Sequence, residues 1–172
     1  MVILGIDPGY GIVGYGAIEV RDDGEPIKLL TYGAITTDPN MSFCDRLDVI
    51  FENMLEIIGN IRPNIMAVEK LFFRNNQKTA IDVAQARGVI LLSGKKCKVL
   101  LQEFTPLQVK MIITGYGRAK KNQIMDSVKE ILKLDKVPKP DDAADAVALA
   151  ICSAKKMQEQ KNTVSDAKKV LA

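Results

Sequence analysis

Apolar and polar positions near the start of the chain are arranged in a way that predicts three strands. Val2–Asp7 is an apolar run that ends in an acid and is followed by the turn pair Pro8-Gly9. Gly14–Val20 and Ile27–Thr36 follow as further strand-like segments, with a turn at 21–24 between them. Two glycines within three residues would weaken a helix in the second segment, so a strand is the better interpretation. This opening predicts an antiparallel meander.

The spacing of apolar residues then changes to the period of a helix. Between 42 and 61, apolar side chains recur three and four positions apart, and Arg62-Pro63 ends the pattern. Thr105 followed by Pro106 is a typical helix start. Helices are also predicted at 77–92, from 106 to about 113, at 121–134 and from 142 to about 156, and strands at 65–68 and 98–102.

This order of elements predicts an α/β fold in one domain. Three strands followed by helices that alternate with two more strands give a mixed five-stranded sheet flanked by helices. The first three strands are expected to be antiparallel and the last two parallel. We assign residues 1–156 to this domain and 157–172 to a polar C-terminal tail of the kind that frays.

Composition excludes several kinds of chemistry. The 172 residues include no histidine, which excludes Ser-His-Asp catalysis, Cys-His catalysis and histidine-containing zinc sites. Cys44, Cys97 and Cys152 lie far apart and are predicted to be buried apolar filler. The longest segment free of charge, 8–18, falls short of the roughly 20 residues of a spanning helix. The N-terminus lacks the basic lead of a secretory signal, so a cytoplasmic protein is expected.

Charge is distributed unevenly along the chain, although the net charge of +3 is ordinary. Residues 1–60 hold 3 basic and 10 acidic side chains, whereas residues 61–172 hold 21 basic and 11 acidic ones. A strongly basic half favours an anionic partner, with nucleic acid as the leading candidate. The same distribution also fits an ordinary lysine-rich solvated surface.

Four carboxylates hold positions that favour a metal site. Asp7 and Glu69 come at the ends of two predicted strands, and Asp142 and Asp145 lie three apart, hence on one face of the last predicted helix. Alanines around the pair would let that helix approach the sheet and bring the four acids together. Oxygen ligands without imidazole or thiolate suit Mg²⁺ or Mn²⁺, and two such ions can activate a water and stabilise the leaving oxygen of a phosphodiester. Asp142 taken alone also fits an ordinary acid at a helix N-terminus.

The basic half of the chain offers candidate nucleic-acid contacts in two segments. The first is a glycine-containing loop flanked by cations, and its candidates are Lys110, Arg118 and Lys121. The second follows Glu69 directly and places aromatic residues among cations; its candidates are Phe72, Phe73 and Arg74. Adjacent phenylalanines usually mean that at least one is core, but an exposed aromatic beside a metal site could stack on unpaired bases.

A glycine pattern near the N-terminus resembles a nucleotide-binding motif but lacks its context. Gly9-Tyr-Gly11-Ile-Val-Gly14 matches the dinucleotide fingerprint after a strand. The fingerprint requires a helix next, whereas the following residues alternate like a strand. Nucleotide binding is therefore a distant alternative.

The motifs together resemble the RuvC family of bacterial Holliday junction resolvases, which have the ribonuclease H-like fold. Of the matching segments, Asp-Ala-Ala-Asp-Ala and Gln-Ala-Arg-Gly-Val are the specific ones. In the family's order, from residue 1 to about 155, the segments are Gly5-Ile-Asp7-Pro-Gly9, Gly14-Tyr-Gly16, Val68-Glu69-Lys-Leu-Phe72, Gln85-Ala-Arg87-Gly88-Val89, Gln108-Val-Lys110, Gly115-Tyr-Gly117, Lys121-Asn-Gln123 and Asp142-Ala-Ala-Asp145-Ala.

The resemblance implies a crossover junction endodeoxyribonuclease that depends on Mg²⁺ and acts in homologous recombination and repair. Its catalytic and metal-binding acids would be Asp7, Glu69, Asp142 and Asp145. Some family members have histidine at the position of Asp142. Basic residues near the scissile strand would be Lys110 and Lys121, and Phe72 would be an aromatic at the junction centre. The products would be paired, symmetric nicks with 5′-phosphate and 3′-hydroxyl ends.

The same resemblance implies protein partners. Resolving a four-way junction needs two like cuts, so a two-fold homodimer is expected, with the helix at 77–92 as a reasonable interface. Association with the RuvA–RuvB branch-migration complex is also implied. Two alternatives stay open: a ribonuclease H-like nuclease of the YqgF type that cuts another nucleic acid, and a module that binds branched DNA without cutting it.

Overall fold

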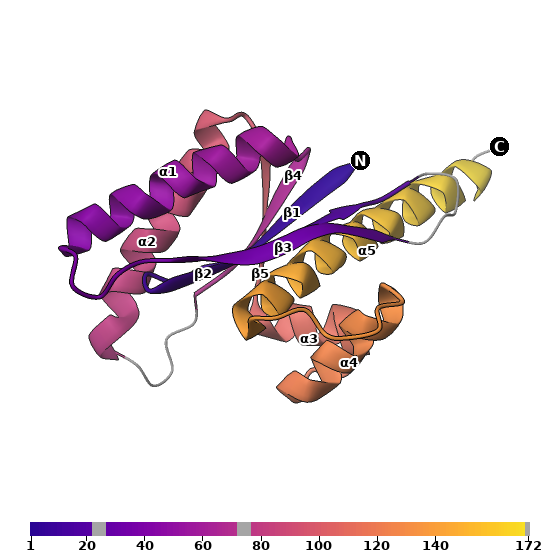
Figure 1. Ribbon diagram of the computed structural model, residues 1–172. Helices are drawn as coiled ribbons and strands as arrows, with labels where there is room; N and C mark the ends of the chain where they lie inside the picture. Colours follow the sequence, from indigo (N-terminus) through magenta and orange to yellow (C-terminus); the bar gives the residue numbers. More distant parts are fainter. Residues whose placement is uncertain (22–26, 72–76, 171–172) are drawn as a thin grey trace.

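A five-stranded sheet runs through the centre of the molecule, in a computed structural model that describes residues 1–21, 27–71 and 77–170 (Figure 1). The strands lie in the order β3-β2-β1-β4-β5. The first three pair antiparallel, and β4 and β5 run parallel to β1, as the sequence predicts. Their bounds are β1 Val2–Asp7, β2 Ile12–Glu19, β3 Lys28–Thr36, β4 Ile65–Glu69 and β5 Leu100–Phe104.

Helices cover both faces of this sheet (Figure 1). Helices α1 (Phe43–Ile61) and α2 (Gln77–Lys96) pack on one face, and α3 (Pro106–Thr114), α4 (Lys121–Ile131) and α5 (Asp141–Val170) pack on the other. Side chains of a strand alternate between faces. Leu4 and Ile6 of β1 therefore join the cluster under α1 and α2, while Ile3 joins the cluster under α5.

The predicted helix starts are confirmed by their capping contacts. The side chain of Ser42 accepts a hydrogen bond from the backbone N–H of Asp45 at the start of α1. Thr105 and Gln108 form a reciprocal capping box ahead of α3, with Pro106 in the first turn. These caps satisfy backbone N–H groups that a helix start leaves without partners.

Two predicted boundaries are wrong around the end of α2. The helix continues to Lys96 rather than ending at 92, and β5 begins at Leu100 rather than at 98. The helix closes with a backbone hydrogen bond from Val99 to Gly94, and Lys98 has a positive φ of 59°. The chain is therefore still turning at 98 and cannot yet pair as a strand.

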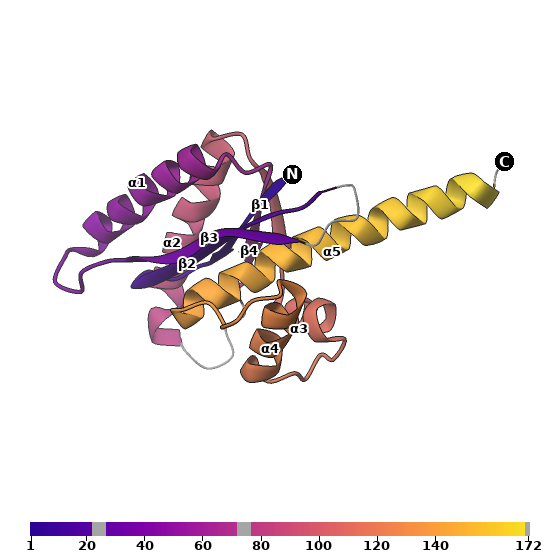
Figure 2. The same cartoon turned by 45° about the vertical axis from the view of Figure 1, so that its right-hand side comes forward.

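The last helix is longer than its sequence pattern predicts. We expected it to end near 156, whereas α5 runs to Val170 (Figure 2). No glycine or proline follows Pro140, and residues 155–161 are mostly lysine, glutamate and glutamine, which favour helix. Figure 2 shows the C-terminal part of α5 extending beyond the sheet. The division into a domain at 1–156 and a tail at 157–172 stays a prediction.

Burial of the cysteines is only partly as expected. Cys152 is buried in α5, but Cys44 and Cys97 are exposed, so the prediction of buried filler is wrong for these two. Cys44 lies in the solvent-facing first turn of α1, and Cys97 lies in the turn after α2. Among the helices within the described residues, none is both long and apolar enough to span a bilayer.

Glycines in the sheet let α5 cross it at very short range. A Cβ atom at Gly5 of β1 would overlap the backbone carbonyl of Ala146, and one at Gly14 of β2 would overlap that of Asp142. Ala143, Ala144 and Ala146 present small buried side chains from the helix. The prediction that alanines bring the helix close to the sheet is confirmed. Glycines on the strands complete the contact and fix the start of α5 beside the C-terminal end of β1 and the N-terminal start of β2.

Candidate active site

A pocket of about 300 Å³ lies at the carboxyl ends of β1 and β4. Asp7, Glu69 and Asp145 line it, together with Lys110 of α3 and Lys121 of α4. Ligands of open α/β sheets gather at the carboxyl ends of strands, which is where this pocket lies. Three of the four predicted acids and two of the predicted cations therefore meet in one place.

Strand pairing brings the first two acids together. β1 and β4 are parallel neighbours in which Ile6 pairs with Val68, so Asp7 and Glu69 come next on adjacent strands. Asp145 arrives from α5, one turn into the helix, because the glycine-lined contact holds that turn against the sheet. Three segments far apart in sequence thus supply the carboxylates.

Burial and mutual repulsion raise the pKa values of these acids. Desolvation, followed by the charges of Glu69, Asp145 and Asp142, raises the pKa of Asp7 to about 8. Desolvation and then the charge of Asp145 raise the pKa of Glu69 to about 7. Burial also raises the pKa of Asp145, although Lys121 opposes that shift. Without a cation, this cluster therefore retains protons near neutral pH.

Among the described residues, Lys121 is the cation closest to the acids that line the pocket. Its Nζ lies 2.9 Å from a carboxylate oxygen of Asp145 and 3.6 Å from one of Asp141. The hydrogen bond to Asp145 raises the pKa of Lys121. Asp141 in turn accepts a 2.6 Å hydrogen bond from Lys139, which is the main reason that its own pKa is lowered. Part of the negative charge at the pocket is therefore offset by lysine.

The donor set fits a hard divalent cation. All the candidate ligands are carboxylate oxygens, the ligand type that Mg²⁺ and Mn²⁺ prefer. Raised pKa values mean that a bound cation would relieve both the desolvation and the repulsion. Within the described residues, no three such acids already lie close enough to hold one ion. Binding by three of them therefore requires their side chains to turn toward one another.

The remaining predicted site residues are less central or are not described. Asp142 does not line the pocket; its backbone carbonyl lies against Gly14, and its charge contributes to the raised pKa of Asp7. Arg118 is exposed in the loop between α3 and α4. The candidates Phe72, Phe73 and Arg74 lie outside the described residues.

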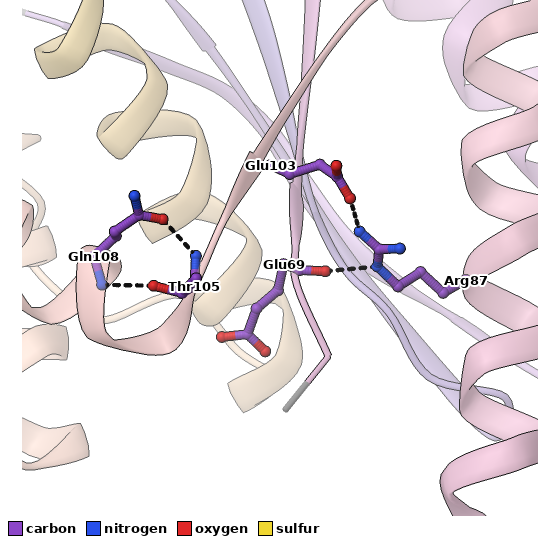
Figure 3. Close-up of polar contacts among 5 residues, drawn as sticks. All are labelled: Glu69, Arg87, Glu103, Thr105 and Gln108. Carbon is purple, nitrogen blue, oxygen red and sulfur yellow. Dashed lines mark hydrogen bonds and ion pairs between the residues drawn. The ribbon is translucent and has the colours of Figure 1, made fainter. Parts of the chain in front are cut away.

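Sequence reasoning missed a polar link behind Glu69. Arg87 of α2 donates a hydrogen bond to the backbone carbonyl of Glu69 and forms an ion pair with Glu103 of β5 (Figure 3). The signal lay within the Gln-Ala-Arg-Gly-Val segment, in which no role was assigned to Arg87 itself. An acceptor on the main chain leaves no trace in the sequence, so the pattern alone could not reveal the partner.

Comparison with known families decides the assignment. The family model described as "Crossover junction endodeoxyribonuclease RuvC" matches residues 3–153. The chain belongs to the RuvC family. The RuvC of Halothermothrix orenii is 52% identical over 152 residues, which are 88% of this chain and 91% of that protein. The RuvC of Thermosipho melanesiensis is 53% identical over 154 residues, or 90% and 97% of the two chains.

A solved RuvC structure agrees with this result. The chain is similar to Thermus thermophilus RuvC in complex with a Holliday junction substrate, with a TM-score of 0.87 and 32% identity. The match covers 93% of this chain and 96% of the other. Membership of the RuvC family confirms the predicted ribonuclease H-like fold and nuclease activity, and RuvC nucleases depend on a metal. The matched range also contains all four predicted acids.

Proposed function

We propose that this chain is a structure-selective endonuclease that resolves four-way DNA junctions by paired, symmetric nicks. The observation that carries the proposal is the pocket in which buried carboxylates meet two lysines at the ends of β1 and β4. Such a centre suits phosphodiester hydrolysis, because the acids attract metal ions and the lysines attract the phosphate. A four-way junction is supported as the substrate because the related RuvC of Thermus thermophilus was solved in complex with a Holliday junction.

The proposed cofactor is Mg²⁺, with two ions in each site and Mn²⁺ as a substitute. Its ligands would be Asp7, Glu69, Asp142 and Asp145. Bound divalent cations supply Lewis-acid stabilisation of the charge that develops on the scissile phosphate and the leaving oxygen. Asp7 and Glu69 are fixed by the paired strand ends, and the raised pKa values let each hold a proton until a cation displaces it.

The proposed DNA surface surrounds this pocket. Lys110 and Lys121 line the pocket and would contact phosphates of the cleaved strand, while exposed Arg118 would contact the backbone farther out. Lys121, already beside the acids, would also offset charge on the reacting phosphate. Three further candidates follow Glu69 closely in sequence: Phe72 is proposed to lie at the junction centre, and Phe73 and Arg74 are proposed as additional DNA contacts.

A homodimer is proposed on the exposed face of α2. Between 81 and 92 the exposed residues of this helix lie along one side of it and form a stripe, which ends before the exposed Lys95 and Lys96. The stripe is apolar or small at most positions: Ile81, Ala84, Gln85, Gly88 and Leu92. A Cβ atom at Gly88 would meet no atom of its own chain among the described residues. Small residues between two exposed apolar ones suit close packing against the same helix of a second copy.

The proposal extends to products and partners by family membership. Nicks with 5′-phosphate and 3′-hydroxyl ends would be ready for a ligase, as repair and homologous recombination require. The RuvA–RuvB branch-migration complex would deliver the junction. The bacterial cytoplasm, which contains the chromosome, is the proposed location.

The activity test compares junction with linear DNA. The protein is incubated with a synthetic four-way junction and with a linear duplex of the same sequence, with and without Mg²⁺. We expect cleavage of the junction alone, only with metal, and none by Asp7→Asn. Asp48→Asn, an exposed acid on α1, is the control for charge and should cleave like the unmodified protein. Junction binding without cleavage in the presence of any divalent metal would refute the proposed endonuclease activity. Equal cleavage of linear DNA would refute the proposed selectivity for junctions.

A further inference from the structure

Arg87 joins three elements behind the acidic pocket. It belongs to α2, and its side chain is 16% exposed. Its Nε donates a 2.8 Å hydrogen bond to the backbone carbonyl of Glu69 at the end of β4 (Figure 3). Its Nη2 forms an ion pair with the carboxylate of Glu103 on β5. One planar guanidinium group therefore holds both strand ends at once.

The peptide that follows Glu69 is held at both of its edges. The N–H of Lys70 donates a 2.8 Å hydrogen bond to the backbone carbonyl of Phe104 on β5. In a trans peptide this N–H and the carbonyl of Glu69 point in opposite directions, so β5 cannot bond both. Arg87 supplies the donor on the second side. Rotation of this peptide would break one of the two hydrogen bonds, so its orientation is fixed.

Arg87 approaches Glu69 from the face opposite the pocket. Met66 and Val68 of β4 face the helices α1 and α2, whereas Ile65 and Ala67 face α5. Glu69 continues the second series, which directs its carboxylate into the pocket, and Figure 3 shows that carboxylate pointing away from Arg87. Arg87 therefore touches the main chain of Glu69 but not the pocket.

We propose that Arg87 is a positioning residue for cleavage, which fixes the direction of the Glu69 carboxylate by clamping the end of β4. The proposal rests on the function proposed above. Glu69 is the final residue of its strand, so few ladder contacts restrain it on the far side. Displacement of a reacting group by about 1 Å can cost on the order of 100-fold in rate, so a clamp at this peptide has a kinetic consequence. Helix α2 also carries the proposed dimer stripe, so Arg87 links the helix of the proposed interface to the strand that carries Glu69.

The test separates positioning from folding and from DNA binding. Arg87→Gln, Arg87→Lys and Glu103→Gln are compared with Lys96→Gln, which removes an equal charge from the exposed end of α2. Three quantities are measured: the single-turnover cleavage rate with protein in excess, the Kd for junction DNA without metal, and the Kd for Mn²⁺ without DNA. The free energy of unfolding is measured for every variant.

We expect a selective loss in the rate and in the affinity for Mn²⁺. Arg87→Gln should lower the cleavage rate about tenfold or more and weaken Mn²⁺ binding severalfold, while the Kd for junction DNA stays within about twofold. Arg87→Lys keeps the charge but cannot make both contacts in the fork, so it should stay well below the unmodified rate. Glu103→Gln leaves the hydrogen bond from Arg87 to Glu69 in place, so its cleavage rate should fall less than that of either Arg87 variant. Lys96→Gln should lose nothing.

Other outcomes overturn the proposal. An unchanged cleavage rate in Arg87→Gln and Arg87→Lys would exclude a positioning role. A loss of rate that equals the fraction of unfolded protein would exclude it too. If Arg87→Gln fails to fold, Arg87→Lys and Glu103→Gln decide by the same criteria. If the unmodified protein cleaves no junction, the proposed function fails, and the Mn²⁺ affinities still decide whether Arg87 positions Glu69.

Discussion

The ammonium group of Lys121 lies 2.9 Å from a carboxylate oxygen of Asp145, inside the pocket that also holds Asp7 and Glu69. The ammonium charge repels a divalent cation that approaches this carboxylate, although the second oxygen of Asp145 stays available as a ligand. Asp141, with an oxygen 3.6 Å away, is the second partner of the lysine. Lys121 thus competes with the metal before the reaction and offsets phosphate charge during it.

Replacement of Lys121 should separate metal binding from catalysis. In Lys121→Met the acids lose their competing cation, so Mn²⁺ should bind severalfold more tightly to the DNA-free protein. The cleavage rate at saturating metal should nevertheless fall by about 10-fold to 100-fold, because a charge near the phosphate is lost. Calorimetric titration and single-turnover assays measure the two quantities. Lys120→Met, at the exposed neighbouring position, is the control for metal binding; weaker Mn²⁺ binding in Lys121→Met would contradict this account.

Stability of the metal-free protein should depend on Asp7 in a defined pH range. The pKa of Asp7 is about 8 in the fold against an ordinary 3.8, so between these values the folded chain holds a proton that the unfolded chain has lost. By linkage, this group makes the fold less stable as pH rises from about 4 to about 8. Asp7→Asn should remove that part of the slope, and its Tm should exceed that of the unmodified protein at pH 8 without metal.

Thermal unfolding in EDTA at pH 5 to 8 measures this effect. Asp48→Asn should show the slope of the unmodified protein, since Asp48 lies outside the acidic pocket. Added Mg²⁺ should raise the Tm more at pH 8 than at pH 6, because cation binding displaces protons from the acids. Equal slopes in Asp7→Asn and the unmodified protein would show that Asp7 is not a buried, proton-retaining group.

A methyl group at Gly14 should separate α5 from the sheet. The new Cβ would overlap the backbone carbonyl of Asp142, so the first turn of α5 must move. We expect Gly14→Ala to lose about 1–3 kcal/mol of unfolding free energy in urea and to lose most of its cleavage rate. Gly59→Ala, where nothing lies near the new atom, should gain about 0.5–1 kcal/mol in α1. Unchanged stability in Gly14→Ala would mean that the close contact is not required.

The sequence was sufficient for the order of elements and for most of the acidic site. Apolar runs and helical spacing predicted each strand and helix, and Asp7 and Glu69 were singled out because each ends a predicted strand. Lys98 shows what was missed: its positive φ belongs to a turn that depends on contacts between α2 and the following residues. The position of Asp142 outside the pocket depends on the rotation of α5 about its axis, which periodicity leaves undetermined.

The exposed stripe on α2 should be required for dimerisation. A charge at Leu92, which is 51% exposed, would be buried without a partner in the proposed interface, so Leu92→Glu should be a monomer in sedimentation experiments. Leu30→Glu, at an exposed position on β3, should leave the oligomeric state unchanged. Identical sedimentation of Leu92→Glu and the unmodified protein would exclude this face as the interface.

The position and symmetry of the nicks test the central claim most directly. A four-way junction is labelled on each strand in turn, cleaved under single-turnover conditions with Mg²⁺, and mapped on denaturing gels. We predict nicks at matching positions on two strands of like polarity, with ends that a DNA ligase seals into linear duplexes. Unpaired nicks at unrelated positions, or ends that cannot be ligated, would contradict the assignment of this chain as a junction resolvase.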